Sequence, residues 1–262
     1  MTYEDRDLTT AETEGGSRSS ASHGRHLPVW QETVLLLVGA LVLAVVIKAL
    51  FVQAFYIPSE SMEPGLVKND RILVEKPSYW LGGSPQRGDV VVFADPGGWL
   101  GPEEVSEGAN PATRLLTKVG LYPSGGHLVK RVIGVAGDVV ECCDKQGRLM
   151  VNGKPITETA YARPSESGCA PGTSGQCFGP MPGERHWKTP PVPKGMLFVM
   201  GDNRAHSADS SYHLCTASET DCSDSPWVPE DDVVGKVMAV VWPASKFRIE
   251  HRPDSFETVP AP

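Results

Sequence analysis

Hydroxyl, amine and carboxyl side chains occur together in three short runs that are far apart in the sequence. They are PSESMEP at residues 58–64, KRVIGVAGD at residues 130–138 and GDNRAHSADS at residues 201–210. A serine hydroxyl becomes a strong nucleophile when a base, such as a neutral lysine amine, removes its proton. Each run alone also fits a structural role: turn serines before a proline, a solvent-facing strand lysine, or a polar hairpin loop. The chemistry therefore depends on whether the fold brings the runs together.

Six runs rich in β-branched and aliphatic residues, bounded by Gly, Pro and Asp, predict strands that would position these side chains. They lie at residues 71–76, 89–94, 127–135, 148–153, 195–200 and 233–242. Two stretches without this pattern, 96–126 and 160–193, are expected to be loop-like insertions. The sequence thus predicts a mainly β protein with one antiparallel domain over residues 56–252 and a flexible tail over residues 253–262.

Residues 33–55 form an apolar run that predicts a single transmembrane anchor. At about 1.5 Å per residue this run spans roughly 34 Å, enough to cross a hydrocarbon core of about 30 Å. Trp30 and Tyr56 flank the run as interfacial residues do. A cleaved signal peptide and a buried core helix are the alternatives. No small-x-small cleavage site follows, and the polar, non-periodic residues 1–32, expected to be disordered, are too long for an ordinary signal-peptide start.

The six cysteines favour disulfides in an oxidising compartment. The local pairs Cys169–Cys177 and Cys215–Cys222 are predicted because each lies within a short polar loop, whereas the adjacent Cys142 and Cys143 stay unassigned. Buried free thiols are the alternative. No C-x-x-C pair or His/Cys cluster at zinc-ligand spacing occurs, so no structural metal is expected.

The formal net charge of −8 argues against a nucleic-acid partner, because phosphate affinity comes from clustered Lys and Arg. The charges around the apolar run do not favour an internal N-terminus, since basic residues follow the run as well as precede it. The cysteines place the β domain outside instead.

Taken in this order, the three runs resemble those of the bacterial type I signal peptidases (leader peptidases). The resemblance extends from the anchor to about Ile249 and includes RGDVVVF at residues 87–93, VNGKPI at residues 151–156 and GKVMAVVWP at residues 235–243. It implies a membrane-bound serine endopeptidase that removes N-terminal signal peptides from exported preproteins through an acyl-enzyme. It also implies a β domain of the signal-peptidase and repressor-protease type on the extracytoplasmic side of the cell membrane. We expect a monomer that contacts membrane lipid and needs no cofactor.

The resemblance implies roles for the matched residues. Ser61 corresponds to the nucleophile and Lys130 to the general base. Ser59 corresponds to a hydroxyl that joins the Ser61 N–H in the oxyanion hole, and Ser207 to a hydroxyl that positions the lysine. The supporting polar and ionic positions are Asp202, Arg204, Asp209 and Arg131.

Members of this family cleave after small residues at the first and third positions before the cut, typically Ala-x-Ala. Such a preference implies two shallow apolar subsites. The residues expected to line them are Met62, Val90, Val91, Val92 and Phe93.

A lysine base needs an unusual environment. A free lysine has a pKa near 10.4, whereas a base at neutral pH needs a pKa nearer 7–8. This difference costs roughly 4 kcal/mol, which desolvation in an apolar pocket can supply. Strand alternation permits Lys130 to point inward and Arg131 outward. The Ser207 hydroxyl would then satisfy the buried amine without adding charge.

Two departures from the family pattern affect the support around this pair. Many members have Arg after the Asp-Ser of the third run, where this chain has Ser211, so we expect Arg131 or Arg204 to pair with Asp209 instead. Ala205 and His206 replace the more usual polar pair before Ser207. A Ser/His/Asp triad using His206 or His127 is the rival chemistry, but no G-x-S-x-G elbow occurs.

Other readings remain for the whole chain. A related Ser/Lys peptidase is one, either a self-cleaving repressor, which would carry a DNA-binding domain in place of the span, or a conjugation-pilin processing enzyme. A non-catalytic, membrane-tethered β module that binds secreted proteins is the other. Loss of cleavage in Ser61→Ala and Lys130→Ala variants separates a protease from such a module.

Overall fold

The computed structural model describes residues 28–80, 82–101, 126–165, 178, 187–215 and 224–262. Most of the predicted tail (1–32) and of both predicted insertions lies outside these residues. The chain divides into two compact units, Met1–Val42 and Leu43–Pro262.

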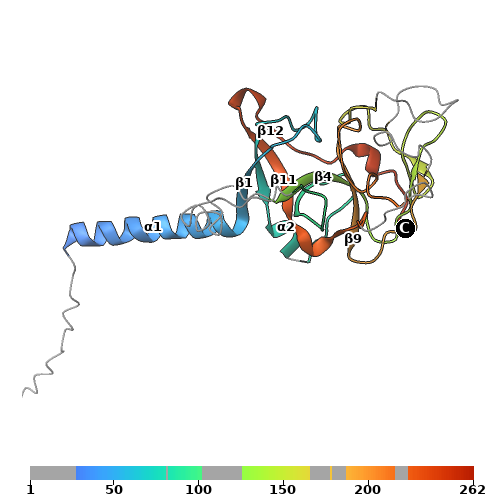
Figure 1. The fold of residues 1–262 in the computed structure, drawn as a ribbon. Coiled ribbons are helices and arrows are strands. Elements are labelled where there is room, and N and C mark those ends of the chain that lie inside the picture. Colours follow the sequence, from blue (N-terminus) through green and yellow to red (C-terminus); the bar gives the residue numbers. More distant parts are fainter. Residues whose placement is uncertain (1–27, 81, 102–125, 166–177, 179–186, 216–223) are drawn as a thin grey trace, which may run out of the picture. The chain divides into compact units, whose positions relative to one another are not determined.

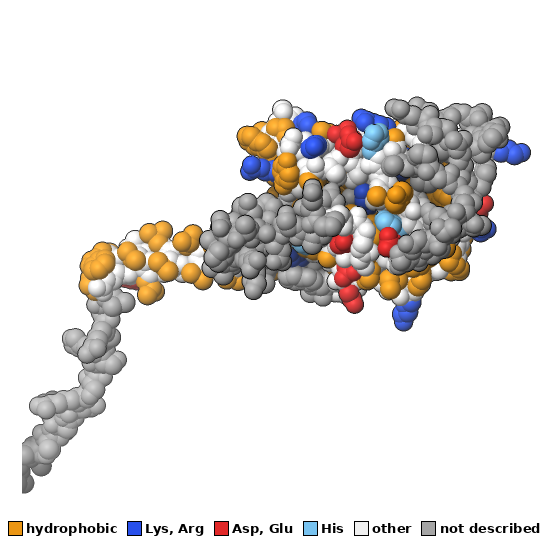
Figure 2. Space-filling model, viewed as in Figure 1, with side chains coloured by type: hydrophobic (Ala, Val, Ile, Leu, Met, Phe, Trp, Pro, Cys, Tyr) orange, Lys and Arg blue, Asp and Glu red, His pale blue; other side chains and the backbone are white. Residues whose placement is uncertain are grey.

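The N-terminal apolar run forms helix α1 (Val29–Phe51). Among the described residues α1 is the one helix long and apolar enough to cross a membrane, judged by length and composition. None of its residues from Val29 to Val46 is buried by the rest of the protein, and Figure 2 shows hydrophobic side chains covering this stretch. Such a surface suits a lipid environment better than water.

The predicted anchor extends too far at its C-terminal end. Residues 52–55 are not helical but belong to strand β1 (Val52–Tyr56), which pairs antiparallel with β2 (Arg71–Glu75). Gln53 and Phe55 are buried while their neighbours are less so. This alternation is typical of a strand, and the partner strand that stabilises it could not be seen in the apolar run.

The larger unit is built on an eight-stranded antiparallel sheet, in the order β1-β2-β11-β3-β4-β9-β10 with β12 added to β11 (Figure 1). Its remaining strands are β3 (Val90–Ala94), β4 (His127–Gly134), β9 (Met196–Met200), β10 (Val228–Pro229), β11 (Val233–Trp242) and β12 (Arg248–Ile249). The mainly antiparallel β prediction is confirmed. β1, β10 and β12 were missed because they are short or continue a helix.

A second, four-stranded antiparallel sheet has the order β7-β6-β5-β8. Its strands are β5 (Val140–Cys142), β6 (Met150–Val151), β7 (Lys154–Pro155) and β8 (Trp187–Lys188). The short helices of the unit are α2 (Pro77–Trp80), η1 (Glu230–Asp232), η2 (Ala244–Lys246) and η3 (Asp254–Phe256).

The centre of the large sheet is apolar on both faces. Every residue of β3 from Val90 to Phe93 is at most 1% exposed, and these residues divide between two core clusters. β3 pairs with β4, with Lys130 opposite Val91 and Arg131 opposite Val90. Two charged side chains are thereby carried into the interior by a central strand.

The C-terminal segment is ordered against the core rather than a flexible tail as predicted. Phe256 and Val259 are 5% and 7% exposed and belong to the core cluster around Ile133 and Leu149. A Cβ on Gly88 would lie 2.9 Å from the Phe256 ring. Two buried apolar side chains supply the free energy that orders this segment, although its Pro-rich composition suggests a linker.

Three of the six cysteines, Cys142, Cys143 and Cys215, lie within the described residues. Cys142 and Cys143, which the sequence left unassigned, are bonded to each other. Cys215 is also disulfide-bonded, but its predicted partner Cys222, like the predicted Cys169–Cys177 pair, lies outside the described residues. No described cysteine is a free thiol, so the alternative of buried thiols is wrong for these three.

Candidate active site

The segment that contains Ser61 follows β1 and is held by the loop after β9. The backbone N–H of Asn203 donates to the Ser61 carbonyl at 3.0 Å. The Asn203 side chain donates to the Glu60 carbonyl at 3.1 Å. Since Asn203 is fully buried, these bonds fix the first and third predicted runs against each other.

Lys130 is brought to the same loop by β4. It is 3% exposed, and its Nζ donates to Ser207 Oγ at 3.1 Å. Ser207 Oγ in turn donates to Asp209 Oδ2 at 2.6 Å. The hydroxyl therefore accepts from the lysine and donates to the carboxylate, which orients the amine and separates it from the Asp209 charge.

Gly201 lies between the two serine-bearing segments. A Cβ at this position would be 2.3 Å from Ser207 Oγ and 2.4 Å from the Ser61 carbonyl oxygen. Real Cβ atoms do not approach other atoms so closely, so only glycine fits. The Ser61 backbone and the Ser207 hydroxyl thus both lie against Gly201. Lys130 is connected to this place by its hydrogen bond to Ser207.

Asp209 is held by neutral donors and not by an arginine, so the expected pairing with Arg131 or Arg204 is wrong. The carboxylate accepts from the backbone N–H of Gly201 at 2.9 Å and from that of Ser211 at 3.0 Å. It also accepts from the hydroxyls of Ser207 and Ser211, the latter at 2.5 Å. Ser211 therefore supplies two hydrogen bonds at the position where the resemblance led us to expect a cation.

Arg131 does not point outward to solvent as predicted but is 2% exposed. It forms a bidentate pair with Asp202 at 2.8 and 2.7 Å, contacts Glu250 at 3.2 Å and lies over the Tyr161 ring. Burial acts to lower the pKa of Arg131, but the Asp202 carboxylate outweighs it, and the pKa lies above its ordinary value. Strand alternation places Lys130 and Arg131 on opposite faces of β4. Both faces are covered by the rest of the protein, so neither side chain reaches solvent.

Arg204 pairs with Glu158, a residue that the sequence did not single out. The guanidinium donates to Glu158 at 2.6 and 3.1 Å and to the Gly201 carbonyl at 2.8 Å. Burial acts to lower the pKa of Arg204, and the Glu158 carboxylate raises it above its usual range. Neither side chain has exposed surface. The buried pair therefore stabilises the loop that carries Gly201, whose carbonyl accepts from Arg204. A single glutamate between the predicted strand 148–153 and the predicted insertion 160–193 carries no sequence signal of such a role.

Replacing Glu158 by Ala is expected to lower the free energy of unfolding by about 3–5 kcal/mol, because it leaves the Arg204 guanidinium buried without its counter-charge. Urea unfolding of the full chain in detergent, followed by tryptophan fluorescence, measures this loss. Glu141→Ala is the matched control, since it breaks the exposed pair with Lys188 (3.3 Å) and should cost less than about 1 kcal/mol. Similar losses in both variants would contradict this stabilising role.

The remaining predicted site residues lie near Ser61 or in the core. Ser59 Oγ is 3.3 Å from Ser61 Oγ. The side chains predicted to line substrate subsites, Met62 and the four residues from Val90 to Phe93, are at most 1% exposed. They form no open surface in this structure, and their contact with substrate stays a prediction.

The two histidines of the rival triad have other contacts. Nδ1 of His206 lies 3.0 Å from Glu60 Oε1, and the His127 ring packs against Phe55 at 5.5 Å between centroids. Among the described residues there is also no group of three or more His, Cys, Asp or Glu side chains that could hold a metal ion.

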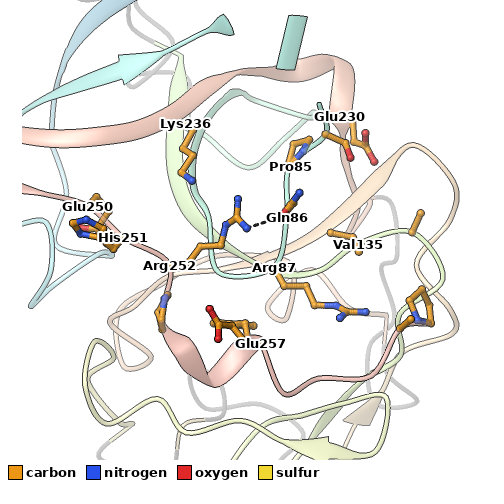
Figure 3. Close-up of a pocket in the computed structure, with 16 residues that line it drawn as sticks. Pro85, Gln86, Arg87, Val135, Glu230, Lys236, Glu250, His251, Arg252 and Glu257 are labelled. Carbon is orange, nitrogen blue, oxygen red and sulfur yellow. Dashed lines mark hydrogen bonds between the residues drawn. The ribbon is translucent and has the colours of Figure 1, made fainter. Parts of the chain in front are cut away.

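A cavity of about 710 Å³ lies elsewhere in the unit, and neither Ser61 nor Lys130 lines it (Figure 3). Its cations already have carboxylate partners: Asp89 accepts from Lys236 at 2.8 Å and from Arg252 at 2.5 Å. Arg87 pairs with Asp138. Ser84 and His251 both line this cavity, but no hydrogen bond joins them. The catalytic candidate is therefore the Ser61–Lys130 region.

Comparison with known proteins bears on this arrangement. Residues 30–242 match the family model for signal peptidase, peptidase S26. Signal peptidase I of Mycobacterium tuberculosis (strain H37Rv) is 39% identical over 238 residues, covering 84% of this chain and 74% of that protein. Probable signal peptidase I of Mycobacterium leprae is 37% identical, covering 93% and 86%. Signal peptidase I of Leptolyngbya laminosa is 30% identical, covering 79% and 77%.

Proposed function

Because the chain belongs to the signal peptidase family, peptidase S26, we propose that it cleaves signal peptides from preproteins with Ser61 as the nucleophile and Lys130 as the base. The observation that carries this proposal is the buried Lys130 amine, which donates to the Ser207 hydroxyl at 3.1 Å. That hydroxyl and the Ser61 carbonyl both lie close to Gly201. Burial disfavours the ammonium form, so this environment suits a lysine that must act as a base.

The first half of the reaction forms an acyl-enzyme. The neutral Lys130 amine takes the proton of the Ser61 hydroxyl while Ser61 Oγ attacks the scissile carbonyl carbon. The negative charge that develops on the carbonyl oxygen is stabilised by the Ser61 N–H and the Ser59 hydroxyl. Collapse of the tetrahedral intermediate breaks the C–N bond, and the Lys130 ammonium gives its proton to the leaving amine.

The second half regenerates the enzyme. Lys130, again neutral, takes a proton from a water molecule that attacks the Ser61 ester. The ester bond breaks, and the proton returns to Ser61 Oγ. The amine donates one hydrogen to Ser207, and in its neutral form its lone pair accepts the Ser61 or water proton.

The preprotein is proposed to carry small residues such as Ala at the first and third positions before the cut. Its hydrophobic signal segment and α1 would share one bilayer, which raises the effective concentration of the cleavage site. Lipid contact is also supported within the β unit, where Trp242, Phe247 and Ile249 are each more than half exposed. Exposed aromatic side chains are typical of membrane interfaces.

We propose that the protein is a monomer that crosses the cell membrane once. Its β unit would lie on the extracytoplasmic side. The disulfide-bonded state of Cys142, Cys143 and Cys215 supports an oxidising compartment. Protease added to the outside of spheroplasts is expected to digest the β unit. Protection until the membrane is dissolved would contradict this orientation.

Mass spectrometry of cleavage products tests the proposed function. The full chain in detergent, incubated with a preprotein bearing an Ala-x-Ala site, is expected to release the signal peptide at that site. The Ser61→Ala variant should release none, and a Thr117→Ala variant, changed in the first insertion outside the matched runs, should behave as wild type. Binding without cleavage by the wild-type chain would favour the non-catalytic β module instead.

A further inference from the structure

The His206 imidazole and the Glu60 carboxylate are in contact at the border of the candidate site. The distance from His206 Nδ1 to Glu60 Oε1 is 3.0 Å, and the two side chains are 58% and 56% exposed. Glu60 stands between Ser59 and Ser61, and His206 immediately precedes Ser207. The contact therefore joins the residue before the nucleophile to the residue before the hydroxyl that binds Lys130.

This contact is the most exposed of several that hold the segment around Ser61 against the loop containing Asn203 and His206. Beneath it, Asn203 donates to the carbonyls of Glu60 and Ser61. The backbone N–H of His206 donates to the Asn203 carbonyl at 3.0 Å, so His206 and Asn203 belong to one turn. At the other end of the nucleophile segment, Glu63 pairs with Arg163 at 3.4 Å. Glu60 thus contacts an imidazole, and Glu63 contacts a guanidinium, of neighbouring loops.

We propose that the His206–Glu60 pair positions the nucleophile segment against the Gly201–Ser211 loop during the reaction, so that His206 is a positioning residue and not a base. This inference rests on the proposed function. The physical reason is the distance between Ser61 and Lys130. Ser207, on the Gly201–Ser211 loop, binds the Lys130 amine, so proton transfer requires the Ser61 segment to keep its position against that loop. Small displacements of reacting groups reduce rates strongly. An exposed pair contributes little to overall stability, so its effect should appear in turnover more than in folding.

A double-mutant cycle tests the pair. Glu60→Ala and His206→Ala are each expected to lower kcat about three- to fivefold with KM unchanged, since a contact between exposed polar side chains has a modest energy. The double variant should lose no more than either single variant, because the two residues act as one unit. The charge-swapped variant Glu60→Lys with His206→Glu should recover most of the activity.

Lys188→Ala is the matched control. It breaks an exposed ion pair, with Glu141, in the four-stranded sheet, and should leave kcat unchanged. Multiplicative losses in the double variant, a change in KM alone, or full activity in both single variants would overturn the positioning role.

Amide hydrogen exchange of the peptide covering residues 57–64 supplies a readout that needs no catalysis. Exchange should accelerate in Glu60→Ala and His206→Ala and stay unchanged in Lys188→Ala. Unaltered exchange in the first two variants would overturn the inference even if the chain is an active signal peptidase. A wild-type chain that cleaves nothing would instead contradict the proposed function, while the exchange result still decides whether the pair holds the segment.

Discussion

Replacing Lys130 by Met is expected to lower kcat/KM for preprotein cleavage by about four orders of magnitude, the loss typical of removing the base of a nucleophile–base pair. Without the amine, the Ser61 hydroxyl keeps its proton and cannot attack the carbonyl carbon. Lys130→Arg should lose as much activity, because a guanidinium with a pKa above about 12 does not give up its proton in a protein. Purified full-length variants in detergent, assayed on one preprotein under single-turnover conditions, measure these losses.

The same assay separates the base from its positioning group. Ser207→Ala removes the hydroxyl that accepts from Lys130 at 3.1 Å, and we expect a loss of about 100-fold, since the amine remains but is less well oriented. Lys188→Met controls for removal of a lysine from the exposed surface and should retain full activity. Substantial activity in Lys130→Arg would contradict the assignment of Lys130 as the base.

Gly201→Ala is expected to reduce kcat by about 100-fold or more, although it adds a single methyl group. That methyl would lie 2.3 Å from Ser207 Oγ and 2.4 Å from the Ser61 carbonyl oxygen. The second of these atoms is backbone, so the segment carrying the nucleophile must move away, and a displacement of about 1 Å costs roughly that factor. The added strain should also lower the free energy of unfolding by about 1–3 kcal/mol.

Gly65→Ala provides the comparison for this prediction. Its added Cβ would meet its nearest neighbours, Asp202 Oδ2 and the Met62 carbonyl, at 3.5 Å, an ordinary van der Waals distance. We expect kcat within about threefold of wild type. If Gly201→Ala retained comparable activity, the close approach of the two serine-bearing segments would not be required for turnover.

The partners of Asp209 could not be predicted from local sequence. The family resemblance led us to expect an arginine at the position of Ser211, and therefore a pairing of Asp209 with Arg131 or Arg204 instead. Arg131 and Arg204 are instead committed to Asp202 and Glu158. Two hydroxyls and two backbone N–H groups donate to Asp209 where a cation was expected. Only the contacts of the folded chain reveal these donors.

The kinds of element and the order of the reactive residues follow from local features of the sequence. The apolar run that becomes α1 and the β-branched runs that become β2, β3, β4, β9 and β11 are recognisable because burial imposes a local periodicity on neighbouring residues. The order of Ser61, Lys130 and Ser207 is likewise a property of the chain, as is the family to which those runs belong.

The partners of those residues, in contrast, depend on contacts between distant parts of the folded chain. The end of α1 and the start of β1 depend on pairing with β2, and the ordering of the C-terminal segment depends on a core that accepts Phe256. Lys130 meets Ser207 across 77 residues, and Arg131 meets Glu250 across 119. Propensity and periodicity act between near neighbours in sequence, whereas contacts over such separations follow from how the sheet closes and which charges its interior can neutralise.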